Sequence, residues 1–278
     1  MTPRDLLRSA SESFRRTGIP DPEYDSAMLL SALTGQPPLL LRLDLDTVLD
    51  EKTIRSFGDL CARRLQREPL QYILKEAFFC GLLFHVDSRV LIPRPETELL
   101  CEWAADLLSG MDCPQILDLC CGSGCLGISL KLRFPASSVT LSDLSAHALD
   151  VAQLNAARLH AETDLLQSDL FDRLGRRSFD LIISNPPYIP SLSCSSLQPE
   201  VMKEPLMALD GGSDGLAFYR RICADAPSRL HSGGWLLMEL GDGESDPVRS
   251  MMLEAGFASV EIRNDYQSLP RMIGGKLP

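Results

Sequence analysis

The chain has 278 residues, of which 45% are hydrophobic and 23% charged, and its mean hydropathy of +0.00 is typical of a soluble globular protein with one large and one small domain. No stretch reaches the roughly 18 apolar residues of a membrane span, and the N-terminus lacks a signal-peptide pattern. The nine cysteines show no Cys-x-x-Cys spacing, which argues against a disulfide framework and a zinc site and favours a reducing cytoplasm. Acidic and basic residues balance in the first 75 residues, so the later residues carry the net charge of −11, the wrong sign for binding a phosphate backbone.

The first part of the chain has a helical pattern. Apolar residues recur at helical spacing from Pro3 onwards, and the turn residues Gly18-Ile-Pro-Asp-Pro22 interrupt them. A second apolar stripe follows, and a third runs over 47–67. We therefore predict an N-terminal helical domain over residues 1–75. At that size a single core is marginal, so this domain should rest on its neighbour or on a partner.

Residues 76–92 alternate between apolar and polar and carry several aromatic residues, which predicts a β-hairpin linker with Asp87-Ser-Arg89 as its turn. The next stretch, Pro93-Arg-Pro-Glu-Thr-Glu98, opens a predicted helix that runs from residue 99 to 108, because a proline and acidic residues suit a helix start. Its ionisable groups could also line a cleft. We assign residues 93–278 to one larger domain.

A strand, a glycine-rich loop and a helix follow in Gln115-Ile-Leu-Asp-Leu-Cys-Cys-Gly-Ser-Gly-Cys-Leu-Gly127, with the helix at 128–132. This order opens a nucleotide-binding α/β fold, in which glycines let the backbone approach a ligand. The second strand, at 139–142, ends in Asp143, where an acid can reach a ribose diol. Asp143 also precedes Ser145 and the helix predicted after it, so an ordinary helix cap is the alternative interpretation.

The rest of the chain continues this alternation. A strand at 164–169 leads to Phe171, which is placed either to cover an adenine face or simply to pack in the core. The loop at 191–217 is long, and loops of that length tend to be functional. The remaining predicted elements are a helix at 216–230, a strand at 235–240 and an antiparallel β-hairpin at 258–273. We therefore predict an α/β, Rossmann-like fold with a mostly parallel sheet, a C-terminal antiparallel hairpin and a small N-terminal helical bundle.

The stretch Leu181-Ile-Ile183 predicts a buried parallel strand that ends in Asn185-Pro-Pro-Tyr188. The two prolines, Pro186 and Pro187, end the ladder of hydrogen bonds and stiffen the backbone. The amide oxygen of Asn185 and the carbonyl of Pro186 can together accept both hydrogens of a planar NH2 group. Tyr188 can stack on that group and exclude water. The corner suits an amide or the amino group of adenine or guanine; a simple Pro-rich turn is the alternative.

Three kinds of function agree with these motifs. Gly122-x-Gly-x-x-Gly127 satisfies the dinucleotide fingerprint, but no His lies in a context that would serve hydride transfer by an NAD-dependent oxidoreductase. A binding module without chemistry is the second, because Cys120 and Cys121 have no paired His and are interpreted as packing residues. An adenosine-type cofactor beside an amino-binding corner favours the third, methyl transfer from S-adenosylmethionine. The sulfonium is already a good leaving group, so alignment can replace an early general base.

The sequence resembles a known family. Asp118-Leu-Cys-Cys-Gly-Ser-Gly124 with Asn185-Pro-Pro-Tyr188 is similar to class I S-adenosylmethionine-dependent methyltransferases that act on amino groups. The stretches that narrow the resemblance are Glu68-Pro-Leu-Gln-Tyr-Ile73, Val90-Leu-Ile-Pro-Arg-Pro-Glu-Thr-Glu98, Asn185-Pro-Pro-Tyr-Ile189 and Glu204-Pro-x-x-Ala-Leu-x-Gly-Gly-x-Asp-Gly215. Together they resemble the PrmC/HemK family, which methylates the amide nitrogen of the Gln in the Gly-Gly-Gln motif of peptide chain release factors and releases S-adenosylhomocysteine. Asn-Pro-Pro-Tyr alone is shared with adenine and guanine N-methyltransferases, which remain the alternative.

The resemblance also implies roles for residues. It implies a substrate-recognition role for residues 1–75, and a methyltransferase catalytic domain at 93–278. It implies that Asn185 and the Pro186 carbonyl accept the amide hydrogens while Tyr188 packs on the amide plane, with Pro187 in the same substrate loop. The implied cofactor-binding residues are Asp118, Cys120, Cys121, Gly122, Ser123, Gly124, Asp143, Phe171 and Asn185.

At Cys120-Cys121 the family usually has Gly-Thr, so a side chain at 120 can crowd the methionine end of the cofactor. The expected partner is a release factor, with no direct nucleic-acid binding and no membrane. The expected state is a monomer in the cytoplasm.

Overall fold

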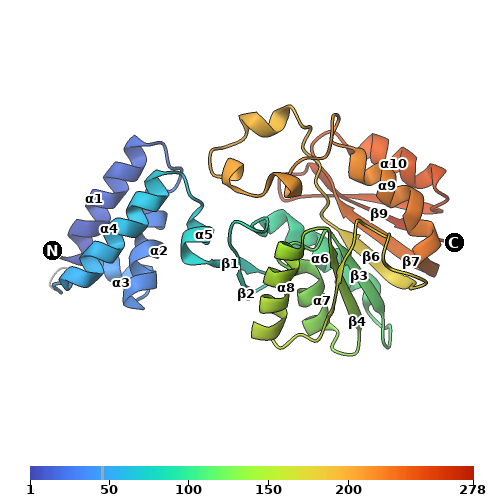
Figure 1. Cartoon of the computed structure of the whole chain (residues 1–278), viewed down its shortest axis with the longest axis horizontal. Coiled ribbons are helices and arrows are strands. Elements are labelled where there is room, and N and C mark those ends of the chain that lie inside the picture. Colours follow the sequence, from blue (N-terminus) through green and yellow to red (C-terminus); the bar gives the residue numbers. More distant parts are fainter. Residues whose placement is uncertain (45–46) are drawn as a thin grey trace. The chain divides into compact units, whose positions relative to one another are not determined.

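The structure is a computed structural model that describes residues 1–44 and 47–278 and divides the chain into two compact units (Figure 1). The first unit comprises residues 1–76 together with 198–203, and the second comprises residues 77–197 together with 204–278. None of the helices in the described ranges combines the length and the apolar character that crossing a membrane requires.

The first unit is a helical bundle, as the apolar periodicity predicts; residues 45–46 of the predicted range lie outside the described residues. Its helices are α1 (Pro3–Arg16), α2 (Pro22–Thr34), α3 (Pro38–Leu43), α4 (Glu51–Leu65) and α5 (Leu70–Leu74). Helix α4 begins later than the predicted residue 47, because the side chain of Asp50 accepts a hydrogen bond from the backbone N–H of Thr53 and so caps the helix at that point. The short helices α3 and α5 were not predicted; each begins beside a proline.

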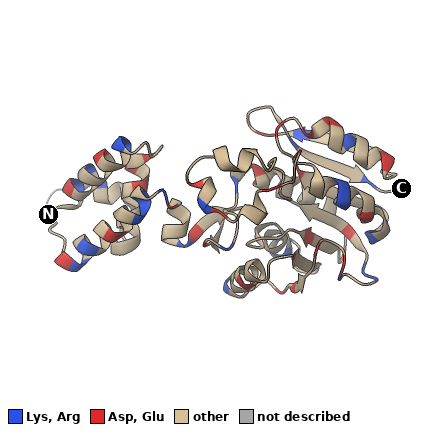
Figure 2. Cartoon of the chain, turned by 45° about the horizontal axis from the view of Figure 1, so that its top comes forward, with Lys and Arg blue, Asp and Glu red and all other residues tan. Residues whose placement is uncertain are grey.

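The core of the first unit is apolar, with side chains such as Phe14 and Leu30 fully buried. Charged residues are spread along the bundle helices (Figure 2). Two charged residues of the bundle are buried, Asp25 at 5% and Arg64 at 4% exposed, and Arg64 donates hydrogen bonds to Asp25 at 2.7 Å and to Glu200 at 2.9 Å. Glu200 lies in residues 198–203, so its ion pair with Arg64 connects this segment to the bundle. Separating the pair would leave Arg64 as a buried charge with one partner fewer, which is costly.

The predicted hairpin is present, but its turn lies elsewhere. Strands β1 (Glu76–Phe79) and β2 (Leu82–His85) pair across Cys80-Gly81, whose φ angles are 49° and 74°. Two consecutive positive φ angles are the signature of the tight turn that matches the twist of a hairpin. The prediction of Asp87-Ser-Arg89 as the turn was wrong. That segment follows the hairpin, and the Asp87 carboxylate accepts hydrogen bonds from the backbone and guanidinium of Arg89.

Residues 77–278, all of them described, contain a seven-stranded sheet in the order β5-β4-β3-β6-β7-β9-β8. The strands are β3 (Gln115–Leu119), β4 (Ser138–Asp143), β5 (Asp164–Gln167), β6 (Phe179–Ser184), β7 (Leu230–Glu239), β8 (Ser259–Asn264) and β9 (Pro270–Lys276). β3 to β7 pair in parallel, whereas β9 is antiparallel to both β7 and β8. The strand order reverses between β3 and β6, which creates the switch point at which such sheets bind ligands.

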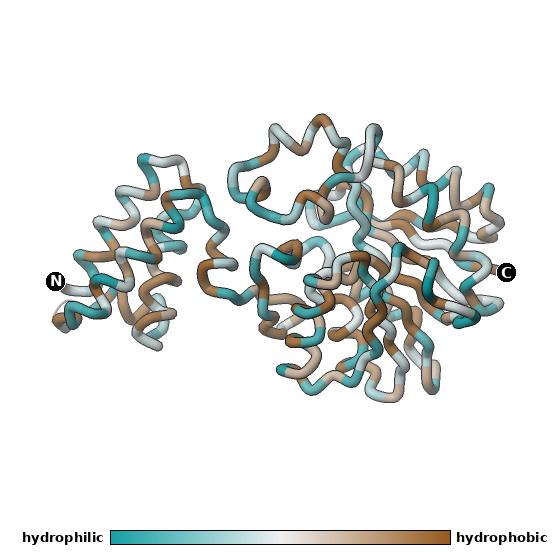
Figure 3. The backbone as a smooth tube through the Cα atoms, viewed as in Figure 1, coloured by the Kyte–Doolittle hydropathy of each residue, from teal (hydrophilic) through white to brown (hydrophobic). Residues whose placement is uncertain are grey.

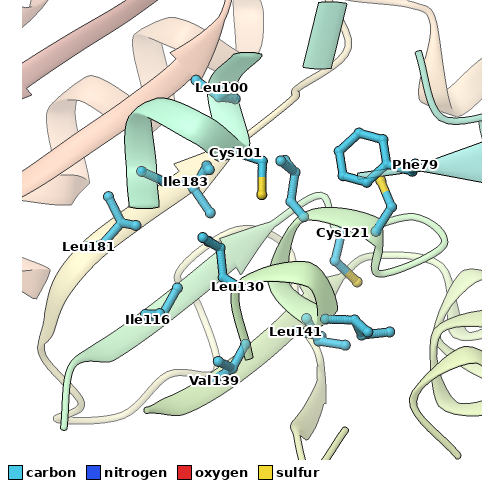
Figure 4. Packing of buried hydrophobic residues seen from close by; sticks show 14 of the residues in the cluster. Phe79, Leu100, Cys101, Ile116, Cys121, Leu130, Val139, Leu141, Leu181 and Ile183 are labelled. Carbon is cyan, nitrogen blue, oxygen red and sulfur yellow. The ribbon is translucent and has the colours of Figure 1, made fainter. Parts of the chain in front are cut away.

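Helices cover both faces of the sheet (Figure 1). Helices α6 (Pro95–Leu108), α7 (Cys125–Arg133) and α8 (Ala146–Arg158) contribute to one core, and α9 (Ala217–Asp225) and α10 (Ser245–Glu254) to the other. Neighbouring residues of a strand point to opposite faces. Ile116 and Ile183 therefore pack on the same side as Leu130 of α7 (Figure 4), whereas Ile182 packs on the side of α9. Because both faces are buried, the central strands are almost continuously hydrophobic (Figure 3).

The last third of the chain follows the predicted alternation with local differences. The loop after β6 contains three short 3-10 turns: η1 (Ser193–Ser196), η2 (Val201–Lys203) and η3 (Leu206–Ala208). Helix α9 ends at Asp225 and continues as the 3-10 turn η4 (Ala226–Arg229), because Pro227 has no N–H to continue an α-helix. Strand β7 therefore begins before the predicted residue 235. Helix α10 was not predicted, whereas the antiparallel pairing of β8 and β9 was.

Candidate active site

A cavity of about 490 Å³ lies at the carboxyl ends of β3, β4 and β6, at the switch point of the sheet. Its volume falls within the roughly 300–1,000 Å³ typical of small-molecule sites. The lining comes mainly from five parts of the second unit. They are the segment before and at the start of α6, the turns after β3 and β4, the corner after β6, and the segment 205–210. Among the lining residues are Arg94, Thr97, Asp118, Cys120, Cys121, Gly122, Ser123, Asp143, Asn185, Pro187, Leu206 and Met207.

The turn after β3 brings helix α7 close to the sheet. Gly127 lies in the first turn of α7, where a Cβ atom would stand 2.3 Å from Leu141 Cδ2 and 3.1 Å from the Asp118 side chain. Any larger residue at this position would require Leu141 and Asp118 to shift. The Gly127 N–H donates a hydrogen bond of 2.9 Å to Asp118 Oδ2, which fixes the carboxylate under the turn. The glycine at 127 therefore serves helix packing and the position of an acid.

Two acids face the cavity, and they differ in the hydrogen bonds that they accept. Asp118 is 1% exposed, its Oδ1 has no hydrogen-bond partner among the described residues, and burial raises its pKa to about 7. Asp143 accepts hydrogen bonds from the backbone N–H of Gly122 at 2.9 Å and of Ser145 at 2.8 Å, while burial raises its pKa. Ser145 is itself the N-cap of α8, so Asp143 supports the start of that helix and also lines the cavity. The site is rich in acceptors and suits a ligand with several donors.

The two cysteines of the turn are neutral thiols. Burial raises the pKa of both Cys120 and Cys121, so neither has the thiolate character of a nucleophile. Cys120 has a φ of 57°, in the left-handed region that favours glycine. The departure from the family's usual Gly at this position therefore places a side chain on a backbone conformation better suited to glycine, at the cavity wall.

The corner after β6 is fixed by a chain of hydrogen bonds. Asn185 Nδ2 donates to Thr97 Oγ1 at 3.2 Å, and Thr97 Oγ1 donates to Glu239 Oε2 at 2.5 Å. The Tyr188 hydroxyl donates to Glu239 Oε1 at 3.3 Å. Glu239 is 2% exposed at the end of β7, and burial raises its pKa to about 7. No described residue donates to Asn185 Oδ1, so this oxygen remains an available acceptor beside the cavity.

Sequence reasoning did not assign a role to Thr97 or Glu239. Thr97 lies within the Pro93–Glu98 stretch that carries the family resemblance, but its partner is on a distant strand. Glu239 is an acid that directly follows the apolar run Trp235-Leu-Leu-Met238 at the carboxyl end of β7, and that position was the only signal available for it.

The structure does not bring every expected residue to the cavity. Phe171 is 3% exposed and lies outside the lining, in the hydrophobic core shared with α9 and α10. This position agrees with the alternative interpretation, core packing, and the expected contact of Phe171 with an adenine face stays a prediction. Gly124, Pro186 and Tyr188 also lie outside the lining. The Tyr188 ring packs partly buried against the same core as Phe171.

The lining fits S-adenosylmethionine. The unpartnered Oδ1 of Asp118 suits an ammonium or another donor, and Asp143 supplies acceptor oxygens of the kind that a ribose requires. At Gly122 a Cβ atom would meet nothing within 4 Å, which leaves open space beside the turn. These residues would hold the cofactor between the β3 and β4 turns.

Two domain families match parts of this chain. The PrmC N-terminal domain matches residues 5–74, and the Methyltransferase small domain matches residues 97–205. Among solved structures, the T. Thermophilus 16S rRNA N2 G1207 methyltransferase in complex with AdoMet and guanosine is similar with a TM-score of 0.55. It is 20% identical, over 73% of this chain and 50% of that one. The hMettl16 catalytic domain is similar with a TM-score of 0.59 and 17% identity, over 79% of this chain and 82% of that one. At these identities the likeness shows the methyltransferase fold alone.

Full-length relatives are closer in sequence. A release factor glutamine methyltransferase of Geobacter sulfurreducens is 42% identical over 94% of this chain and 91% of the relative. One of Chlorobaculum tepidum is 42% identical over 96% and 94%, and one of Bordetella pertussis is 39% identical over 92% and 95%. With this identity along nearly the whole chain, the chain belongs to the release factor glutamine methyltransferase family.

Proposed function

We propose that this protein transfers a methyl group from S-adenosylmethionine to the side-chain amide nitrogen of the Gln in the Gly-Gly-Gln motif of peptide chain release factors. The observation that carries the proposal is the state of Asn185 at the cavity edge. Its NH2 group is engaged by Thr97, whereas no described residue donates to its Oδ1. An acceptor held in that way selects a substrate group that carries N–H hydrogens.

The residues of the corner can orient a primary amide. The Pro186 carbonyl accepts no hydrogen bond from the described residues, so it can take the second N–H while Asn185 Oδ1 takes the first. Both contacts draw electron density to the amide nitrogen and fix its plane, which supports attack without a general base beside it. When bound, S-adenosylmethionine supplies the electrophilic methyl group and leaves as S-adenosylhomocysteine. After the N–C bond has formed, the nitrogen releases its extra proton to solvent water.

Further parts of the proposal concern the partner and the setting. We assign residues 1–75 to substrate recognition, residues 76–92 to a linker and residues 93–278 to catalysis. The acidic charge of the catalytic part supports a protein substrate over nucleic acid. We also propose that the protein acts as a monomer in the cytoplasm.

The test uses the full chain, labelled S-adenosylmethionine and, in separate reactions, a purified release factor, ribosomal RNA and DNA. The expected result is a mass gain of one methyl group on the Gln of the Gly-Gly-Gln tryptic peptide. Asn185→Ala should abolish that gain while its affinity for S-adenosylmethionine stays within about threefold of the wild type, because the substituted side chain serves the substrate. Label on nucleic acid alone, or saturation by NAD without binding of S-adenosylmethionine, would refute the proposal. Full turnover by Asn185→Ala would refute the amide-binding mechanism.

A further inference from the structure

The amide of Asn185 has two orientations of nearly equal shape, and only one presents an acceptor to the substrate. Neighbouring groups must therefore select it. Thr97 has one hydroxyl proton, and it donates that proton in a hydrogen bond of 2.5 Å to Glu239 Oε2. The lone pairs of Thr97 are then left to accept from Asn185, so the NH2 end of the amide faces Thr97 and the oxygen faces away.

We propose that Glu239 is a positioning residue that acts through Thr97 to hold the Asn185 amide with Oδ1 towards the substrate. An ionised carboxylate can only accept hydrogen bonds, so it forces both Thr97 and Tyr188 to act as donors. A protonated Glu239 would itself donate one bond, and Thr97 could then donate to Asn185 and turn its NH2 towards the substrate. The inference rests on the proposed function, because it assigns the orientation of the residue that binds the amide.

Charged and titratable groups from β9, α6, α9 and the corner after β6 surround Glu239. Arg271 of β9 favours its ionised form, and Glu96 of α6 opposes it. Tyr188 of the corner donates to one carboxylate oxygen, and Tyr219 of α9 donates to the Glu239 backbone carbonyl at 2.8 Å. Burial is the largest influence, and it brings the pKa of Glu239 to about 7. Turnover at saturating cofactor and substrate should therefore rise about tenfold from pH 6 to pH 8.

Three variants test the positioning role. Thr97→Val removes the hydroxyl but keeps the shape, and it should lower kcat by about 100-fold and abolish the rise with pH. Thr97→Ser restores the hydroxyl and should return kcat to within about threefold of the wild type. Glu239→Gln should lose the rise with pH, because its amide does not titrate. Glu244→Gln is the matched control: Glu244 is a buried acid that bonds to the Gly241 N–H and contacts neither Thr97 nor Asn185, so the pH profile should persist.

A second measurement needs no turnover. The side-chain NH2 signals of Asn185, assigned by their loss in Asn185→Ala, should shift in the NMR spectrum of the cofactor-free protein between pH 6 and 8. The shift should be absent in Glu239→Gln. If wild-type protein methylates no glutamine but the signals behave in this way, the proposed function fails and the positioning role stands. If Thr97→Val and Glu239→Gln keep wild-type kcat, pH profile and Asn185 signals, the positioning role is refuted. Should Thr97→Val fail to fold, Glu239→Gln carries the same decision, because Gln keeps the size of Glu.

Discussion

Raising the pH from 5 to 8 should destabilise the cofactor-free protein through two buried carboxyl groups, Asp118 and Glu239. Burial raises the pKa of each to about 7, from ordinary values of 3.8 and 4.5. Between those values the folded state binds more protons than the unfolded state, so the free energy of unfolding falls as the pH rises. Both groups are protonated in the folded and unfolded states at low pH, where their effect vanishes. Asp25, Asp143 and Glu244, whose pKa values are also raised by burial, act in the same direction.

The magnitude follows from the separation of the pKa values. A carboxyl group that titrates near 4 in the unfolded chain and near 7 in the folded protein lowers the free energy of unfolding by about 2–3 kcal/mol between pH 5 and pH 8. Asp87 acts in the opposite direction, because hydrogen bonds from Arg89 lower its pKa, but it titrates below this window. Asp118 and Glu239 together should therefore lower the free energy by about 5 kcal/mol, a large share of the total stability of a domain.

The assay is urea unfolding of the full chain at pH 5 and pH 8, with Asp118→Asn and Glu239→Gln beside the wild type. In each variant the decrease should be smaller than in the wild type by about 2–3 kcal/mol, because the amide keeps the shape but does not titrate. S-adenosylmethionine at about 100 times its Kd should add roughly 2.7 kcal/mol at either pH to any form that binds it. If both variants show the same decrease with pH as the wild type, Asp118 and Glu239 do not cause the loss of stability, and the prediction is refuted.

Three further substitutions test how the chain is packed. Gly127→Ala should lower the free energy of unfolding by about 1–3 kcal/mol in thermal melts, because its Cβ would meet Leu141. Gly58→Ala in α4 is the control: a Cβ atom there would meet nothing within 4 Å, so this substitution should be neutral or stabilising. Phe171→Leu should cost roughly 1 kcal/mol and leave the calorimetric affinity for S-adenosylmethionine within about twofold, because the ring packs in the core; a larger loss of affinity would support the predicted contact with the adenine. Arg64→Ala should destabilise the first unit by about 3–5 kcal/mol, seen as faster hydrogen exchange in its helices and in residues 198–203, because it removes the partner of the buried Asp25 carboxyl and of Glu200.

Much of the fold followed from local pattern. The apolar runs of β3 and β6, the glycine loop before α7 and the alternation of strands and helices predicted a parallel α/β sheet, because both faces of such strands are buried. The Asn185–Tyr188 corner and Asp143 were also predicted from strand ends, which meet at one edge of the sheet. Element ends were less certain: α4 starts at the Asp50 cap, and the hairpin turns at Cys80-Gly81.

What sequence alone determined is thus the chemistry that neighbouring residues carry: a glycine turn, a stiff Asn-Pro-Pro-Tyr corner and an acid after the second strand. Tertiary structure decided which distant residues support that chemistry. Thr97 and Glu239 lie 142 positions apart in the chain yet share a 2.5 Å hydrogen bond, and Phe171 packs in the hydrophobic core. The physical reason is that periodicity and turn chemistry are local, whereas the direction of a hydrogen bond depends on groups that only the folded sheet brings together.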